Sequence, residues 1–196
     1  MRPGTLTFPD SEPETRSGAP VPKEQQYVHW FGKGVPDQQE WAFRMYNFDD
    51  LSSDDNRSNR TSFYLFNLRA PAGQPNYGVG TYWQEKLQAQ TWYHYVAVVD
   101  EYANGGAGSI TFYKNGSLVS TQAGAKVRSQ WSFTDTINEQ KVTINPQNGT
   151  APVRVGTLDP SARDTSFFKG AIDNVYVYNR ALSAAEVGQL YRDPTP

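Results

Sequence analysis

The chain has 196 residues, a formal net charge of -2 and no cysteine. This length suits a single domain, and the lack of cysteine excludes a disulfide scaffold, a thiolate zinc site and a cysteine nucleophile. The charge gives no basic patch for nucleic acid or an anionic membrane surface, and no apolar stretch approaches the ~18 residues of a membrane span.

Residues 1–26 are polar and rich in proline and glutamate, so we expect a lead-in segment before a domain that covers residues 27–196. Short apolar and aromatic runs then predict strands at 27–31, 41–46, 62–66 and 78–83.

The second of these strands alternates between apolar and polar side chains. Residues two apart point to the same face of a sheet, so Trp41, Phe43 and Met45 are expected to face the core. Arg44 and Tyr46 are then expected on the outer, concave face.

The second half of the chain begins with its strongest strand, residues 92–100, whose near-continuous hydrophobicity predicts burial on both faces. We assign Trp92 to the core, as we do Trp30. The dipeptide Asn115-Gly116 predicts a two-residue hairpin turn. Further strands are expected at 109–114, 118–121, 153–157 and 168–178.

One helix is expected after the last strand. Ser183 and Glu186 have the spacing of a capping box, in which each side chain bonds the other residue's backbone N–H. Leu182 and Val187 have the spacing of a hydrophobic staple, and the helix is expected to end near Tyr191. Strands at short intervals, an Asn-Gly turn and a single helix together predict an all-β sandwich or jelly roll.

Two sequence motifs are more specific than the composition and indicate a family. Trp92–Asp100 and Thr111–Gly116 read WYHYVAVVD and TFYKNG, and Phe168–Ser183 reads FKGAIDNVYVYNRALS. In wording, order and spacing they are similar to phrases of laminin G-like domains in the concanavalin A-like lectin and glucanase superfamily, and Trp30–Tyr46 resembles a bacterial subgroup. The resemblance covers most of residues 27–191. It implies an all-β, concanavalin A-like jelly-roll β-sandwich of antiparallel sheets with one short C-terminal helix.

The start of the chain departs from the pattern of this family. Its members usually open with one or two further strands, one of which pairs with the closing strand. The resemblance therefore implies a truncated start and an open edge along residues 168–178, which a partner chain or an upstream segment could fill.

Glucanases of the superfamily carry a closely spaced carboxylate trio, E-x-D-x-x-E, on one strand, and the sequence lacks this trio. Glycoside cleavage needs two carboxyl groups that flank one bond. The adjacent acids Asp100 and Glu101 would point to opposite faces of a strand, so they do not make such a pair. We expect no enzyme activity, with carboxylates that converge from different strands as the alternative.

Calcium is the ion that the resemblance implies, as a structural cofactor. Asp173 stands where the family often has an acid in the closing strand, which ligates calcium together with carbonyls of an early loop. The alternative is an acid that hydrogen-bonds a neighbouring turn. A loop with Asp49, Asp50, Asp54 and Asp55 is a second place where calcium could bind, or else a solvated surface.

Sugar recognition needs an aromatic face for stacking and planar polar groups for the hydroxyls. The candidate ligand-binding residues of these kinds are Arg44, Tyr46, Asn67, Tyr82 and Trp83. The alternative for each single aromatic ring, and the one we favour, is packing in the core.

These observations lead to a non-catalytic binding or adhesion module whose expected ligand is a carbohydrate. The alternatives are a protein-interaction or structural module of a larger extracellular protein and, third, a glycan-cleaving enzyme. The expected partner is a glycan or a cell-surface protein, within a larger or multidomain assembly. The family is mostly extracellular, so we expect an extracellular or cell-surface location, although residues 1–4 carry no apolar signal-peptide core.

Overall fold

The computed structural model describes residues 1–3, 15–16, 19–20, 27–34, 40–46, 61–67, 77–80, 87–106, 108–123, 149–157 and 168–193. The chain falls into two compact units, which we describe separately. Unit 1 comprises Met1–Ser62, Trp83–Trp92 and Gly149–Ile172, and unit 2 comprises Phe63–Tyr82, Tyr93–Asn148 and Asp173–Pro196.

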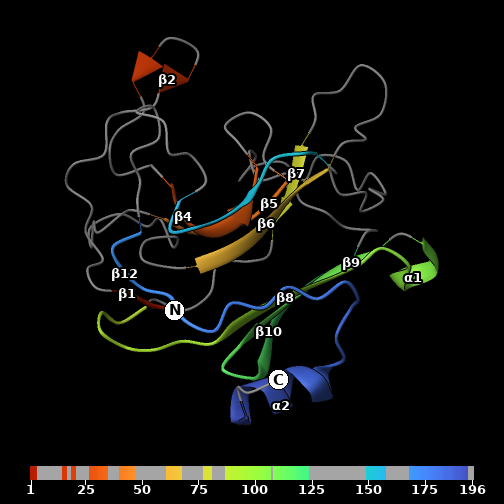
Figure 1. Cartoon of the computed structure of the whole chain (residues 1–196). Helices are drawn as coiled ribbons and strands as arrows, with labels where there is room; N and C mark the ends of the chain where they lie inside the picture. The colour runs from red at the N-terminus through yellow and green to blue at the C-terminus, as the bar shows by residue number, and fades with distance from the viewer. Residues whose placement is uncertain are drawn as a thin grey trace. The chain divides into compact units, whose positions relative to one another are not determined.

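Strands dominate the described residues, as the sequence predicts (Figure 1). The strands are β1 Arg2–Pro3, β2 Thr15–Arg16, β3 Ala19–Pro20, β4 Tyr27–Lys33, β5 Trp41–Tyr46, β6 Thr61–Asn67, β7 Tyr77–Gly80, β8 Tyr95–Asp100, β9 Ser109–Lys114, β10 Ser117–Ala123, β11 Val153–Val155 and β12 Gly170–Ala171. The helices are α1 Ala103–Gly106 and α2 Ala184–Arg192. One sheet has five strands in the order β11-β4-β5-β6-β7, and a second has three in the order β10-β9-β8. The small pairs β1-β12 and β2-β3 are separate from these sheets.

The β4–β5 hairpin forms the aromatic core of unit 1. Its antiparallel ladder has one irregularity, between His29 and Phe31, where Trp30 is the extra residue. A bulge of this kind bends the strand and re-aims a side chain. The Trp30 ring packs on Phe43 with 4.7 Å between centroids, and both side chains are buried. The core position predicted for Trp30 is therefore confirmed.

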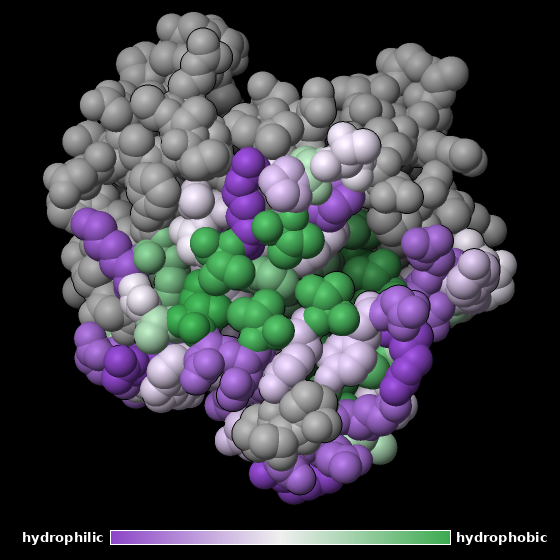
Figure 2. Space-filling view, in the orientation of Figure 1, coloured by the Kyte–Doolittle hydropathy of each residue, from purple (hydrophilic) through white to green (hydrophobic). Residues whose placement is uncertain are grey.

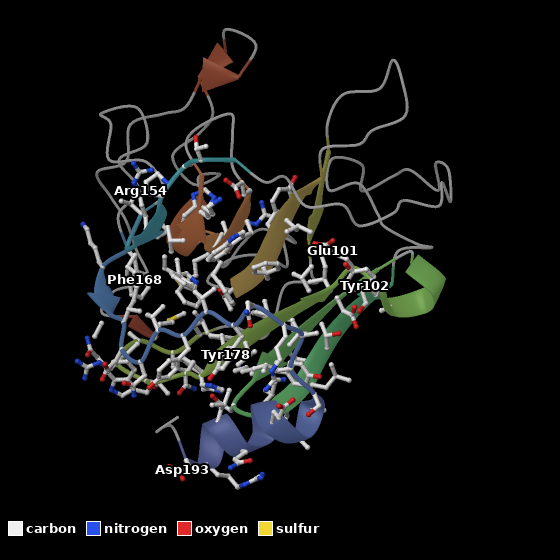
Figure 3. The ribbon with its side chains drawn as sticks, turned by 45° about the vertical axis from the view of Figure 1, so that its right-hand side comes forward. Glu101, Tyr102, Arg154, Phe168, Tyr178 and Asp193 are labelled. Carbon is white, nitrogen blue, oxygen red and sulfur yellow. The ribbon has the colours of Figure 1, made fainter. Side chains whose placement is uncertain are left out.

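Backbone contacts from the end of β11 hold Trp30 in place. Gly156, with a φ of 87°, donates its N–H to the Trp30 carbonyl oxygen over 2.8 Å. Phe168, seen in Figure 3, then donates its own N–H to the Gly156 carbonyl oxygen, also over 2.8 Å. A positive φ favours glycine, so this residue type allows the chain to link the two segments.

The three-stranded sheet of unit 2 contains the predicted hairpin. Asn115 and Gly116 join β9 to β10 with φ values of 51° and 76°, as a type I′ turn requires. The prediction for residues 92–100 is wrong in two respects. The strand begins only at Tyr95, and among the described strands β8 stands at the end of its sheet, with Val98 as its one buried residue. Burial on both faces needs neighbours that a hydrophobic run alone does not reveal.

The closing segment is the largest departure from the predicted strands. Within residues 168–178, only Gly170–Ala171 form a strand. Asn174 has a φ of 52°, and the Asp173 carboxylate accepts its N–H over 2.9 Å. A left-handed residue interrupts an extended chain, so the ladder does not continue. Val175–Tyr178 are all exposed, and Figure 2 shows that hydrophobic side chains do reach the molecular surface.

The first residues of the expected lead-in segment form a short strand. Arg2 and Pro3 form β1 and pair with Ala171 and Gly170 of β12. A Cβ atom on Gly170 would collide with the Arg2 carbonyl oxygen and the Phe168 ring, so this close approach requires glycine. Part of the predicted open edge therefore has a neighbour within the chain.

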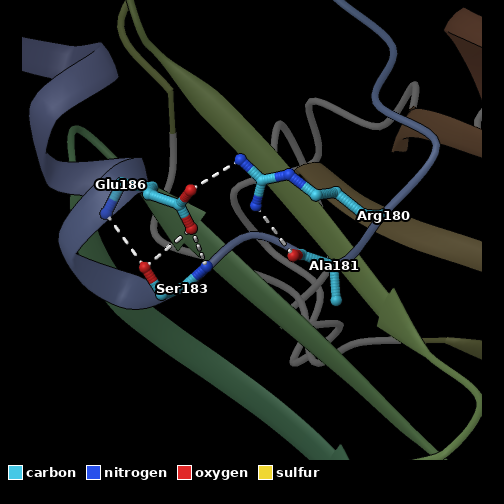
Figure 4. Close-up of polar contacts among 4 residues, drawn as sticks. All are labelled: Arg180, Ala181, Ser183 and Glu186. Carbon is cyan, nitrogen blue, oxygen red and sulfur yellow. Dashed lines mark hydrogen bonds and ion pairs between the residues drawn. The ribbon is translucent and has the colours of Figure 1, made fainter.

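The C-terminal helix has the predicted position and cap. Ser183 Oγ accepts the backbone N–H of Glu186 over 3.3 Å, and the Glu186 carboxylate accepts the N–H of Ser183 over 2.7 Å (Figure 4). Leu182 and Val187 are buried in one cluster with Val98 of β8. The capping box and the staple positions predicted from the sequence are both confirmed.

Candidate functional site

The predicted ligand residue Arg44 lies in a row of polar side chains that crosses the sheet. His29 on β4 pairs directly with Arg44 on β5, and Arg44 Nε donates to Ser62 Oγ at the start of β6 over 3.3 Å. Residues that lie directly opposite one another share a face of the sheet. All three residues are buried, Arg44 with only 5% of its surface exposed. The exposed position predicted for Arg44 is therefore wrong.

The physical reason is that both faces of this hairpin are covered. The alternation in β5 separates the two faces as predicted, because Phe43 pairs with Phe31 whereas Arg44 pairs with His29. Alternation identifies which residues share a face, but it carries no information about what covers that face. Arg44 takes part in a buried network and does not present its guanidinium to solvent.

Burial also fixes the protonation state of His29. Desolvation, followed by the charge of Arg44, lowers the pKa of His29 from 6.5 to about 3. The imidazole is therefore neutral at pH 7, which avoids a second positive charge in the row. A histidine with so low a pKa is a poor general base near neutral pH.

Two of the other predicted ligand residues, Tyr46 and Asn67, lie at the ends of strands. Tyr46 is the last residue of β5. Asn67 is the last residue of β6 and stands five positions after Ser62, about 16 Å along an extended strand. Tyr82 and Trp83 lie outside the described residues, as does the aspartate-rich loop of residues 49–55.

Asp173, the predicted calcium ligand, is exposed, and one of its carboxylate oxygens accepts the N–H of Asn174. Within the part of the chain that the structure describes, no three His, Asp or Glu side chains gather closely enough to hold a metal ion. Calcium usually takes several oxygen ligands, of which the Asp173 carboxylate is one candidate. Calcium binding stays a prediction.

An exposed aromatic site lies instead at Trp92, which the sequence assigned to the core. This residue is 49% exposed, so the core prediction is wrong. The guanidinium carbon of Arg2 lies 5.3 Å from the centroid of the Trp92 ring, which is cation–π distance. The pairing of β1 with β12 fixes the backbone of Arg2, so the contact does not depend on a free tail.

Sequence reasoning missed this site because Trp92 belongs to a continuous apolar run. The signal that could have found it lies just before the run, where Gln88–Gln90 are exposed and Ala89 and Gln90 form a turn, with a φ of 61° at Gln90. Turns lie on the protein surface, so a residue that follows one closely is expected near the surface as well. Nothing in the sequence around Arg2 indicates its ring partner 90 residues away.

The histidine of the WYHY phrase has a structural place. The His94 backbone makes two hydrogen bonds with Asn115. Its carbonyl oxygen accepts the Asn115 N–H over 2.8 Å, and its own N–H donates to the Asn115 side-chain oxygen over 3.0 Å. The His94 ring packs on Tyr191 of α2, with 5.8 Å between centroids. Burial lowers the pKa of His94, so the ring is neutral at pH 7. His94 thus connects the segment just before β8 to the Asn115-Gly116 turn and to helix α2.

The fold and these contacts define an all-β protein of the jelly-roll class with one short C-terminal helix. A family model described as the concanavalin A-like lectin/glucanases superfamily, of laminin G type, matches residues 30–188. The chain therefore belongs to this superfamily. No curated protein and no solved structure is similar to the chain at a significant level. Within the described ranges, no helix has the length and hydrophobicity needed to cross a bilayer.

Proposed function

We propose that the chain is a non-catalytic module that recognises carbohydrate. The observation that carries this proposal is the half-exposed Trp92 ring with the Arg2 guanidinium beside it. An aromatic face can stack on the apolar face of a sugar ring, and a planar group with several N–H donors can bond its oxygens. Membership of a superfamily that includes lectins agrees with this function, but a fold alone is a weak argument for it.

The roles of two described acids, Glu40 and Asp100, support a module without catalysis. Glu40 is buried and bonded to Lys33, with 2.8 and 2.7 Å from Lys33 Nζ to its two oxygens. Asp100 accepts the N–H groups of Tyr102 and Ala103 at the start of α1. Glycoside cleavage needs two carboxyl groups free to face one bond. These acids are engaged in fold contacts instead.

A glycan array with the purified chain tests the proposal, combined with an assay for reducing-sugar release from the same glycans. We expect retention of some glycans without release of reducing ends. A blank array would contradict carbohydrate recognition, provided that the same sample shows a cooperative unfolding transition and is therefore folded during the array. Release of reducing ends would contradict the non-catalytic role.

A protein-interaction or structural module is the second candidate. It is favoured by the four consecutive exposed residues Val175–Tyr178, of which Val177 is 68% exposed. Large apolar side chains gathered at a surface are typical of protein contacts. Concentration-dependent sedimentation together with a blank array would favour this candidate over the first.

The proposal includes a structural calcium ion and an extracellular location. Thermal unfolding with calcium and with chelator tests the ion, because a ligand that binds only the folded state raises the unfolding midpoint. An Asp173→Asn variant would lose a calcium-dependent rise if Asp173 is a ligand.

We place the module outside the cell, where superfamily members of laminin G type are mostly found and where glycans are displayed.

A further inference from the structure

The Trp92 site carries an inference about which carbohydrate it takes. Exposed apolar residues that occur singly are ordinary, so exposure of Trp92 alone says little. What sets Trp92 apart is that a cation fixed by backbone pairing lies over its ring. A guanidinium in this position can stack on the indole and still direct N–H donors outward.

The fold prepares Arg2 for this role. Its backbone pairs with Ala171, and Gly170 leaves no room for a side chain between β12 and the Arg2 carbonyl. The neighbouring Met1 is buried. Little conformational entropy is then lost when a ligand binds the guanidinium.

A second exposed cation, Lys169, directly precedes the strand that pairs with β1. Lys169 is exposed and comes two residues before Ala171, so the alternation of an extended chain places it on the face that Arg2 shares with Ala171. The described residues 1–3, 87–92 and 168–172 contain these two cations and no acid, and the next residue, Asp173, is an exposed acid whose carboxylate accepts the N–H of Asn174. The polar residues beside Trp92 are Gln88, Gln90 and Thr91, which offer amide and hydroxyl groups.

We propose that Trp92, Arg2 and Lys169 form a binding site for an acidic saccharide, that is, an oligosaccharide of uronic acids. This inference rests on the proposed carbohydrate function. The sugar ring stacks on the part of the indole that the guanidinium leaves exposed, and its carboxylate lies against the two cations. Guanidinium and carboxylate match in geometry and form two parallel hydrogen bonds, whereas a neutral sugar would leave both positive charges without a counterion.

The test measures binding by calorimetry with oligosaccharides of polygalacturonate, hyaluronan and alginate. Neutral galactan, cellulose and mannan oligosaccharides of equal length are the matched probes. We expect at least one uronate probe to bind about tenfold or more tightly than its neutral counterpart, and added salt to weaken it. Arg2→Gln and Lys169→Gln should each reduce this preference, and Trp92→Ala should remove binding of both probe types.

Matched controls use exposed residues of the same types in unit 2. Arg192→Gln and Tyr102→Ala should leave uronate binding unchanged. Trp92→Phe keeps an aromatic face and should retain part of the binding, which separates stacking from a folding defect in the alanine variant.

The outcomes separate the two levels of the proposal. No binding to any probe or array glycan would contradict both the carbohydrate function and the site. Equal binding of acidic and neutral probes would overturn the acidic-saccharide inference and leave the carbohydrate function in place. Uronate binding that survives in Trp92→Ala and Arg2→Gln would also overturn the inference, because the site would then lie elsewhere.

Discussion

Trp30 and Trp92 are two tryptophans with opposite surroundings. The Trp30 indole N–H donates to Thr61 Oγ1 over 3.0 Å, and that hydroxyl donates in turn to the Arg44 carbonyl oxygen over 2.9 Å. Trp92 is half exposed and has a guanidinium over its ring. A buried indole needs a partner for its N–H, whereas an exposed one can leave that bond to water. The polar partner of Trp30, Thr61, therefore stabilises the fold, whereas the polar partner of Trp92, Arg2, is open to a ligand.

The ion pairs of the two units show the same contrast. Lys33 Nζ lies 2.7 Å from Glu40, whose side chain is 4% exposed, and Arg180 lies 2.6 Å from Glu186, where the side chains are 57% and 39% exposed. Nearly equal distances thus occur in very different dielectric surroundings. Distance alone does not rank ion pairs, because water screens the exposed one and desolvation penalises any break in the buried one.

The largest expected effect separates the two tryptophans. Trp30→Ala should lower the free energy of unfolding by about 3–5 kcal/mol, because it removes a buried ring and leaves Thr61 without its donor. Trp92→Ala should cost less than about 1 kcal/mol, since an exposed cation–π contact is weak. Denaturant unfolding measures both. Similar losses in the two variants would contradict the difference in burial.

The next effect separates the two ion pairs. Glu40→Ala should cost about 3 kcal/mol in the free energy of unfolding, because Lys33 is left without its carboxylate in a largely buried place. A double variant, Lys33→Met with Glu40→Leu, should be more stable than Glu40→Ala alone. Arg180→Ala should have a small effect that shrinks further in high salt. A salt-sensitive loss in Glu40→Ala would mean that this pair is exposed to solvent.

The buried row of unit 1 predicts a pH dependence of stability. Because the folded pKa of His29 is about 3 and the ordinary pKa of a histidine is 6.5, the unfolded chain binds the extra proton between these values. The stability from neutral His29 is fully present above pH 6.5 and is lost as pH falls toward 3, by up to about 1.4 kcal/mol per pH unit. His29→Gln should flatten this slope in urea unfolding from pH 7 to 4. An unchanged slope would assign the pH dependence to other groups.

Local chemistry made part of this fold predictable. The Asn115-Gly116 turn and the Ser183 capping box follow from φ preferences and side-chain bonds within a few residues, and both occur as expected. The alternation in β5 gave the two faces correctly for the same reason. Such features depend on neighbours along the chain, so one sequence contains the information they need.

The candidate site was not predictable because it depends on contacts between distant segments. The burial of Arg44 arises from cover that alternation does not encode, and Trp92 meets Arg2 only because β1 pairs with β12. The kink at Asn174 ended a strand that hydrophobicity alone would have continued. In each case the missing information was the identity of a spatial neighbour.

The smallest expected effect compares a confined glycine with an open one. Gly116 has a φ of 76°, and a Cβ atom there would meet the Tyr191 side chain at 3.0 Å, whereas Gly105 has a φ of 68° with nothing within 4 Å. Gly105→Ala should cost about 1 kcal/mol for backbone strain, and Gly116→Ala should cost about 1 kcal/mol more because Tyr191 must move. Tyr191→Ala in the Gly116→Ala background should remove this excess, which a double-mutant cycle of unfolding free energies measures. Equal costs for the two glycines would show that the end of α2 yields freely, and that the contacts of Tyr191 with His94 and the hairpin do not hold the helix in place.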